Sequence, residues 1–239
     1  MSDGGKVAVV FGARRLGRAI AAHLAADDWK VTAVARSSET IESLAAEHPE
    51  VAGVVADLGE AGAATRVLEG ARTAAGRIDL IVNAIADPNV SSSALSRESD
   101  GDSALSSAIG VAVAPVHHVV DASVEILRRQ HGGCFIQITG GLALRAQPGT
   151  GALAATGYAT RALTEGALVE AREDGVHVAL LVIRGLIESD LTAAALAGKP
   201  PEASMTSDDV IAAIELLAGQ RRAWTHEVIL TPPVTPWQG

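Results

Sequence analysis

Residues 9–21, VVFGARRLGRAIA, join an apolar run to a helical pattern through a turn that contains Gly12 and Gly17. A strand, a glycine-containing turn and a helix form the first unit of many open parallel sheets, and the unpaired amides of such a turn point beyond the strand end. A glycine pair alone is equally compatible with a tight turn and close helix packing. The segment therefore predicts a strand, a turn and a helix, and it leaves two explanations of the turn open.

The charges on this expected helix oppose its dipole. Arg14, Arg15 and Arg18 lie at its start, whereas Asp27 and Asp28 lie at its end. Each misplaced charge costs about 0.3–1 kcal/mol at an exposed terminus. A bound polyanion would offset this cost, so the arginines favour a pyrophosphate with a further phosphate at the turn; solvated arginines are the alternative.

Six further short apolar segments follow, separated by stretches of helical length. This alternation predicts an α/β fold, in which a doubly wound parallel sheet of seven strands carries helices on both faces. The expected strands are 6–11, 30–35, 51–56, 78–86, 133–139, 176–183 and 227–231. Because no repeat or long linker interrupts the pattern, we expect residues 1–239 to form a single domain.

Two segments depart from the alternation. Residues 91–107 form the most polar stretch and are expected to be a loop before a helix. Residues 187–207 contain two adjacent prolines, and we expect either a lid over a pocket or a plain surface excursion.

Composition excludes several classes of protein. With 48% hydrophobic residues the chain can bury a full core, and its net charge of −9 without a basic stripe argues against nucleic acid as a partner. The start of the chain lacks a signal-peptide pattern and the apolar runs are too short for a bilayer, so we expect no membrane association and a cytoplasmic location. Neither a Cys/His ladder nor a His-x-x-x-His spacing is present, so no metal site is expected.

Cys134 is the only cysteine and lies inside the apolar run CFIQI. An intramolecular disulfide is therefore impossible, and a small buried side chain in a reducing compartment is the simplest interpretation.

Arg36 follows the second expected strand, at the place where NAD-binding proteins carry a carboxylate for the ribose 2′-hydroxyl. A guanidinium instead suits a 2′-phosphate, to which it donates two charge-assisted hydrogen bonds. Together with Arg14 and Arg15, Arg36 favours NADP(H) over NAD(H), although a surface arginine is the plainer alternative.

Over nearly its whole length the chain resembles the short-chain dehydrogenases/reductases, which implies a single-domain Rossmann fold. The turn at 11–21 is similar to that family's Thr-Gly-x-x-x-Gly-x-Gly motif, although it is one residue short. Ala56-Asp57-Leu58 matches the family's aspartate after the third strand, GRIDLIVNAIA (76–86) resembles its Asn-Asn-Ala-Gly segment, and RGLIESDLT (184–192) resembles its Pro-Gly-x-x-x-Thr segment.

The resemblance implies a cofactor site and an oligomer. Asp57 would contact the adenine, and the remaining cofactor contacts would come from Gly12, Leu16, Gly17, Leu58, Asn83, Ala84, Ile85, Gly185 and Ile187. A homodimer or homotetramer would form through helices at about 103–130 and 156–173.

The family's reaction needs a tyrosine, a lysine one helical turn later that lowers the tyrosine pKa, and a serine that orients the carbonyl group. This chain has a single tyrosine, Tyr158, and its lysines are Lys6, Lys30 and Lys199. No lysine can therefore follow the tyrosine by one turn.

The best match to the catalytic helix sets Gly157 at the tyrosine position and Arg161 at the lysine position, which leaves Tyr158 one residue out of register. The loop 140–156 before it looks longer than the family's. Thr139 falls at the serine position, so the resemblance implies Thr139, Tyr158 and Arg161 as catalytic residues, with Arg161 also holding ribose hydroxyls. Arginine stays protonated in proteins and cannot relay a proton.

His117 and His118 lie in a helical stretch with Asp121 about one turn later, and either could be a general base or a plain helix-face histidine at a subunit contact. Three functions stay open. The first is an NADP(H)-dependent carbonyl or related reductase acting on a small-molecule substrate. The second is a non-catalytic NADP(H)-binding sensor or partner protein, and the third is a non-redox cyclase, dehydratase or isomerase.

Overall fold

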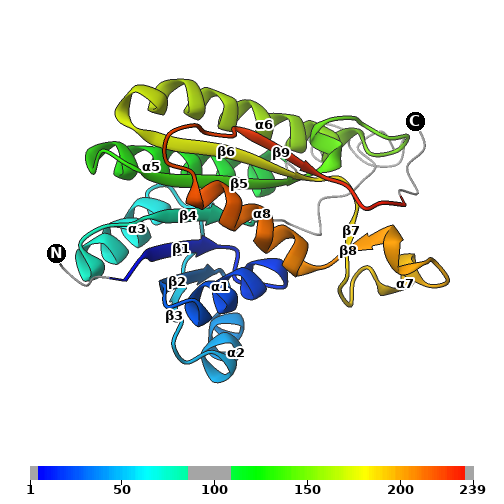
Figure 1. The fold of residues 1–239 in the computed structure, drawn as a ribbon, viewed down its shortest axis with the longest axis horizontal. Helices are drawn as coiled ribbons and strands as arrows, with labels where there is room; N and C mark the ends of the chain where they lie inside the picture. The colour runs from blue at the N-terminus through cyan, green and yellow to red at the C-terminus, as the bar shows by residue number, and fades with distance from the viewer. Residues whose placement is uncertain (1–4, 86–108, 235–239) are drawn as a thin grey trace.

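A computed structural model describes residues 5–85 and 109–234, and it contains a parallel sheet of seven strands in the order β3-β2-β1-β4-β5-β6-β9 (Figure 1). The strands are β1 (Val7–Phe11), β2 (Lys30–Ala35), β3 (Ala52–Val55), β4 (Leu80–Asn83), β5 (Gly133–Gly140), β6 (Val176–Ile183) and β9 (Glu227–Leu230). Every expected strand is confirmed. The expected loop at 91–107 lies outside the described residues.

Among the described residues, six helices cover the two faces of the sheet. One apolar core joins the sheet to α1 (Leu16–Ala26), α2 (Ser38–Glu47) and α8 (Ser207–Gly219). The other joins it to α3 (Ala63–Ala75), α5 (Ala114–Arg129) and α6 (Gly151–Ala171). The sheet is thus doubly wound, and its strand order reverses between β1 and β4, where ligands of such sheets bind.

The ends of β1 to β6 meet along one edge, which we call the carboxyl edge. Short turns continue from it: η2 (Gly141–Ala143) after β5, and β7 (Leu186–Ile187) after β6. The opposite side, where these strands begin, is the amino edge. Because α1 and α8 run antiparallel to the strands, their last turns lie near the amino edge.

The segment 187–207 projects beyond the end of β6 (Figure 1). Its two ends are joined, because β7 pairs in parallel with β8 (Ser204–Met205), and Met205 is buried in the core. Between them lie α7 (Ala193–Leu196) and the short η4 (Pro201–Ala203). The excursion is therefore anchored at its base.

Helix α6 begins at Gly151, so the expectation of a loop that extends to residue 156 is wrong. Pro148 and Gly149 form the preceding bend, where Gly149 has a φ of 76°. Alanine-rich sequence after that bend favours helix, which adds turns ahead of Tyr158. Helix α5 starts at Ala114, directly after the π-helical turn η1 (Ile109–Val113).

The stretch Ile109–Arg129 is long and apolar enough to cross a membrane by length and composition alone. Val119, Ile126 and Leu127 are nevertheless buried in the core against the sheet. A core helix of a packed domain has these same properties, so the stretch carries little weight as a membrane span.

Candidate functional site

The turn after β1 is built so tightly that it requires glycine. Gly12 has a φ of 93°, and a Cβ on it would lie 2.8 Å from the Ala84 carbonyl oxygen. A Cβ on Gly17 would lie 1.9 Å from the Gly12 carbonyl oxygen. These contacts are to the protein's own backbone, so packing alone explains both glycines. The amides of Arg15 and Leu16 nevertheless donate to no acceptor among the described residues, as a phosphate-binding turn requires.

Arg15 has an unusual backbone conformation, with φ 45° and ψ −110°. A residue with a side chain held there costs on the order of 1–3 kcal/mol, and such residues cluster at ligand sites. Strain located between Gly12 and Gly17 therefore supports the ligand explanation of the turn.

The three arginines of this turn divide into two groups. Arg18 donates to Glu47 on α2 at 2.7 Å and to Ser43 at 3.0 Å, and this pairing holds the pKa of the Glu47 carboxyl below its usual value. The expectation that Arg18 contributes to an anion site is therefore wrong, because its charge joins α1 to α2. Arg14 and Arg15 are exposed and form no ion pair with the described residues.

Arg36 and Asp57 line one cavity of about 470 Å³ beside the end of β3. The Asp57 carboxylate accepts from the Gly59 amide at 2.9 Å, which fixes it directly after the strand. Glu60 and Arg66, paired at 3.7 Å, complete the polar part of the wall. The structure thus brings together the two side chains expected at the 2′-phosphate and the adenine.

Leu58 is buried, and its carbonyl accepts from His118 Nδ1 at 2.9 Å. Because a carbonyl oxygen can only accept, Nδ1 is the donor in this bond. His118 therefore joins α5 to the segment after β3, a structural contact that the sequence pattern did not reveal.

Asn83 is fully buried and connects neighbouring strands. Its Nδ2 donates to Gln137 Oε1 at 2.8 Å, and its Oδ1 accepts from the Ile85 amide at 3.3 Å. Gln137 was not singled out from the sequence, although a lone amide inside the apolar run CFIQI was the available signal. Asn83 thus shapes the backbone of Ala84 and Ile85 at the carboxyl edge.

Gly185 and Ile187 lie beyond β6 at the same edge. A Cβ on Gly185 would lie 2.7 Å from Pro232 Cδ, so close packing of the C-terminal segment requires glycine. Ile187 is half-buried and faces Met205 across the β7–β8 pair. Both residues stay predicted cofactor contacts.

Thr139 lies one residue before the end of β5 and is half-buried. Its hydroxyl forms no side-chain hydrogen bond with the described residues. Among the described residues, no partner occupies this hydroxyl at the carboxyl edge.

Tyr158 and Arg161 bond to other parts of the protein. The Tyr158 hydroxyl donates to the Leu144 carbonyl at 2.9 Å, and its side chain is 46% exposed. Arg161 donates two hydrogen bonds to Glu227 on β9, at 2.6 and 2.8 Å, and forms an ion pair with Glu165. These carboxylates raise the pKa of Arg161, chiefly through the bonds to Glu227. The phenol and the guanidinium form no hydrogen bond with each other, and their catalytic roles stay predictions.

The face of α6 that lies against η2 carries Gly157. A Cβ there would lie 3.0 Å from the Ala143 amide nitrogen. The helix can therefore approach the segment after β5 closely only because Gly157 has no side chain. At this position α6 offers no functional group.

The doubly wound sheet, the strained glycine turn at its switch point and the Arg36–Asp57 cavity beside the end of β3 define a nucleotide-binding α/β protein. The family model for short chain dehydrogenase matches residues 6–199, and the chain belongs to this family.

Solved structures agree over nearly the full chain. An alcohol dehydrogenase from the archaeon Thermococcus sibiricus, complexed with 5-hydroxy-NADP, is 25% identical with a TM-score of 0.79, over 98% of this chain and 99% of that one. A gluconate 5-dehydrogenase from Burkholderia cenocepacia J2315, in complex with NADP and tartrate, is 20% identical with a TM-score of 0.81, over 95% and 94%. A metagenomic short-chain oxidoreductase in complex with NADP is 23% identical with a TM-score of 0.78, over 97% and 99%. No curated protein matches the chain.

Proposed function

We propose that the protein is an NADP(H)-dependent oxidoreductase that reduces a carbonyl or related group of a small molecule, with an atypical active site. The observation that carries this proposal is the convergence of Arg36 and Asp57 on one cavity beside a strained, arginine-bearing glycine turn. Family membership and the NADP complexes among similar structures support it.

The residues at the carboxyl edge fit a phosphorylated dinucleotide. Arg14, Arg15 and the amide of Leu16 would hold the pyrophosphate, and Arg36 would hold the 2′-phosphate. Backbone and side-chain contacts would come from Gly12, Gly17, Asp57, Leu58, Asn83, Ala84, Ile85, Gly185 and Ile187. When bound, the nicotinamide supplies or accepts the hydride.

The chain's own residues would orient the substrate and supply a proton. Thr139 offers a hydroxyl to the substrate carbonyl, and the Tyr158 hydroxyl or a water molecule supplies the proton. To do so the Tyr158 hydroxyl must leave the Leu144 carbonyl, which lies 2.9 Å away. Arg161 would contribute only a fixed positive charge, because it cannot release a proton.

Turnover of NADPH tests this function. Purified protein is mixed with NADPH and a panel of ketones, quinones and imines, and oxidation is followed at the cofactor's absorbance band. We expect turnover with at least one compound, and we expect Thr139→Val to lower kcat by about 10²-fold or more while NADPH affinity is unchanged. Oxidation of NADPH by none of the compounds would contradict the proposal.

A second candidate function is NADP(H) binding without turnover. It is favoured by Arg161, whose guanidinium is neutralised by Glu227 and Glu165, and by Gly157 on the helix face next to η2. Tight NADPH binding, an unreactive panel and a partner protein whose affinity depends on NADPH would support it. Any cofactor turnover above that of Thr139→Val would exclude it.

We further propose a homodimer or homotetramer in the cytoplasm, with the segment 187–207 as a lid. The exposed Val169 on α6 supports association through this helix, since it is 72% exposed. Sedimentation of the wild type and of Val169→Asp tests the interface, and a shift to monomer is the expected result.

A further inference from the structure

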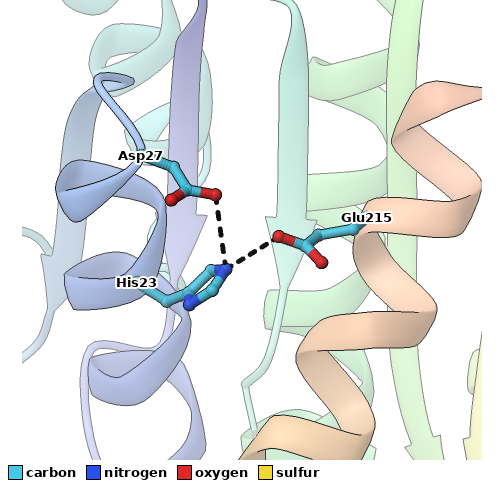
Figure 2. Close-up of side chains that lie close together, drawn as sticks. All are labelled: His23, Asp27 and Glu215. Carbon is cyan, nitrogen blue, oxygen red and sulfur yellow. Dashed lines mark hydrogen bonds and ion pairs between the residues drawn. The ribbon is translucent and has the colours of Figure 1, made fainter.

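Three side chains of the types that bind metal ions meet near the amino edge. This edge lies at the opposite end of the strands from the nucleotide site. His23 and Asp27 lie one turn apart at the end of α1, and Glu215 lies near the end of α8 (Figure 2). The two helices pack side by side on the same face of the sheet. Side chains from both ends of the chain therefore point at one place.

The distances between the donor atoms suit a metal ion. His23 Nε2 lies 2.8 Å from Glu215 Oε1 and 3.6 Å from Asp27 Oδ2, and the three atoms lie within 4.8 Å of one another. A tetrahedral zinc ion with bonds of about 2.1 Å holds its ligand atoms about 3.4 Å apart. Small side-chain rotations would bring all three atoms to that spacing.

The charge within this group of three side chains also favours a cation. Two carboxylates face one imidazole, and the C-terminal end of α1 adds the negative end of its dipole. A proton on His23 would neutralise part of this negative charge. A plain histidine–carboxylate ion pair is therefore the competing explanation.

The group of three side chains is not enclosed by other packed side chains. Asp27 and Glu215 also line a cavity of about 420 Å³ at the amino edge, whose walls include two tryptophans and the cationic side chains Lys6, Arg77 and Arg221. All three ligating side chains are partly exposed, so water can reach the open side of the group. A metal ion held there would keep a position for a water molecule or a small ligand.

We infer that His23 Nε2, Asp27 and Glu215 bind one divalent transition-metal ion of the zinc type. An imidazole ligand selects zinc-like ions over Mg²⁺ and Ca²⁺, which prefer sites made only of oxygen. The sequence predicted no metal site because Glu215 is separated from His23 by 192 positions. The inference does not depend on the nucleotide function. The bound ion would cross-link α1 to α8.

Calorimetric titration with ZnCl₂ tests the inference. The full-length protein is first freed of metal with a chelator and dialysed, and then titrated at pH 7.5. We expect one Zn²⁺ per chain and a thermal unfolding midpoint that rises with Zn²⁺. We expect His23→Gln and Glu215→Gln each to weaken binding by about tenfold or more.

His48→Gln is the matched control, because His48 also lies close to a carboxylate, at 3.5 Å from Glu50, but is not part of the group. It should bind Zn²⁺ as the wild type does. Metal-free unfolding midpoints identify any variant that fails to fold, and Asp27→Asn then replaces it. Absence of Zn²⁺ uptake by the wild type, or unchanged affinity in both His23→Gln and Glu215→Gln, would leave only an ion pair and overturn the inference.

Discussion

The nucleotide corner, formed by β1 to β3 and the turns that follow them, differs sharply from the region around α6. In the corner, the residues expected to act together lie together, and Arg36 and Asp57 share a cavity. Around α6, the expected pair is separated, because Tyr158 bonds to Leu144 and Arg161 bonds to Glu227.

The difference has a physical origin. Binding a pyrophosphate depends on backbone amides and on glycines that a fold cannot replace, whereas proton transfer depends on a few side chains that a fold does not need. One region can therefore keep its geometry while the other loses its functional groups. The proposed reductase and the proposed NADP(H)-binding protein differ only in the second region.

The largest effect is expected from Gly17→Ala. Its new Cβ would lie 1.9 Å from the Gly12 carbonyl oxygen, so the turn must shift. We expect a loss of about 3 kcal/mol in the free energy of unfolding, measured by urea denaturation, together with loss of NADPH binding. Gly70→Ala in α3 is the control, because nothing lies within 4 Å of its added Cβ, and it should gain up to about 1 kcal/mol. Wild-type stability of Gly17→Ala would show that the turn is not as tight as described.

Arg36→Ala tests the cofactor assignment of the corner. Loss of a charge-assisted contact of about 1.5–3 kcal/mol should weaken NADPH binding by about 10- to 150-fold in a fluorescence titration. NADH binding should not change, since NADH lacks the 2′-phosphate. Arg66→Ala removes another arginine from the same cavity wall and should leave both affinities nearly unaltered. Equal losses for NADPH and NADH in Arg36→Ala would argue against a 2′-phosphate site.

Arg161→Met tests whether α6 contributes to the cofactor site. The Arg161 side chain is 25% exposed and joins α6 to β9, so its removal should lower the free energy of unfolding by about 1 kcal/mol. NADPH affinity should stay within twofold of the wild type if the contrast between the regions holds. A tenfold loss of NADPH affinity would make Arg161 a cofactor ligand and remove the contrast.

The smallest effect is expected from His177 on β6. Burial lowers the pKa of His177 below 6.5, so the unfolded chain binds a proton more readily than the folded one. The stabilisation that comes from keeping His177 neutral is therefore fully present above the unfolded pKa, and it is lost as the pH falls through the folded pKa. The unfolding midpoint of the wild type should decrease more steeply between pH 7 and 5 than that of His177→Asn, with NADPH affinity at pH 7 equal in the two proteins.

Most of the fold follows from the sequence because buried parallel strands read as continuous apolar runs. The start of α6 does not, because the stretch 151–157, GALAATG, consists mainly of small residues and shows no clear helical period. Thr156, Thr160 and Thr164 are buried there, one turn apart, and the hydroxyls of Thr156 and Thr164 donate to backbone carbonyls. Polar residues on a buried helix face conceal the pattern that predicts helices.

The tight glycine turn of the corner could be predicted, because its conformation depends on neighbours in the sequence. The partners of Arg18, Asn83 and Arg161 could not, since each lies 29 or more positions away. Such long-range pairs decide whether a charged side chain is free for a ligand, and no local pattern records them. Cys134 is buried as expected, and burial raises the pKa of its thiol to about 12, which makes it unreactive near neutral pH.

The strained backbone of Arg15 should determine which residue laboratory evolution selects at this position. Glycine adopts its conformation without strain, so selection for heat resistance alone should recover glycine at this position first. Selection for growth that depends on the cofactor should instead retain arginine. The two regimes would thus drive a single codon in opposite directions.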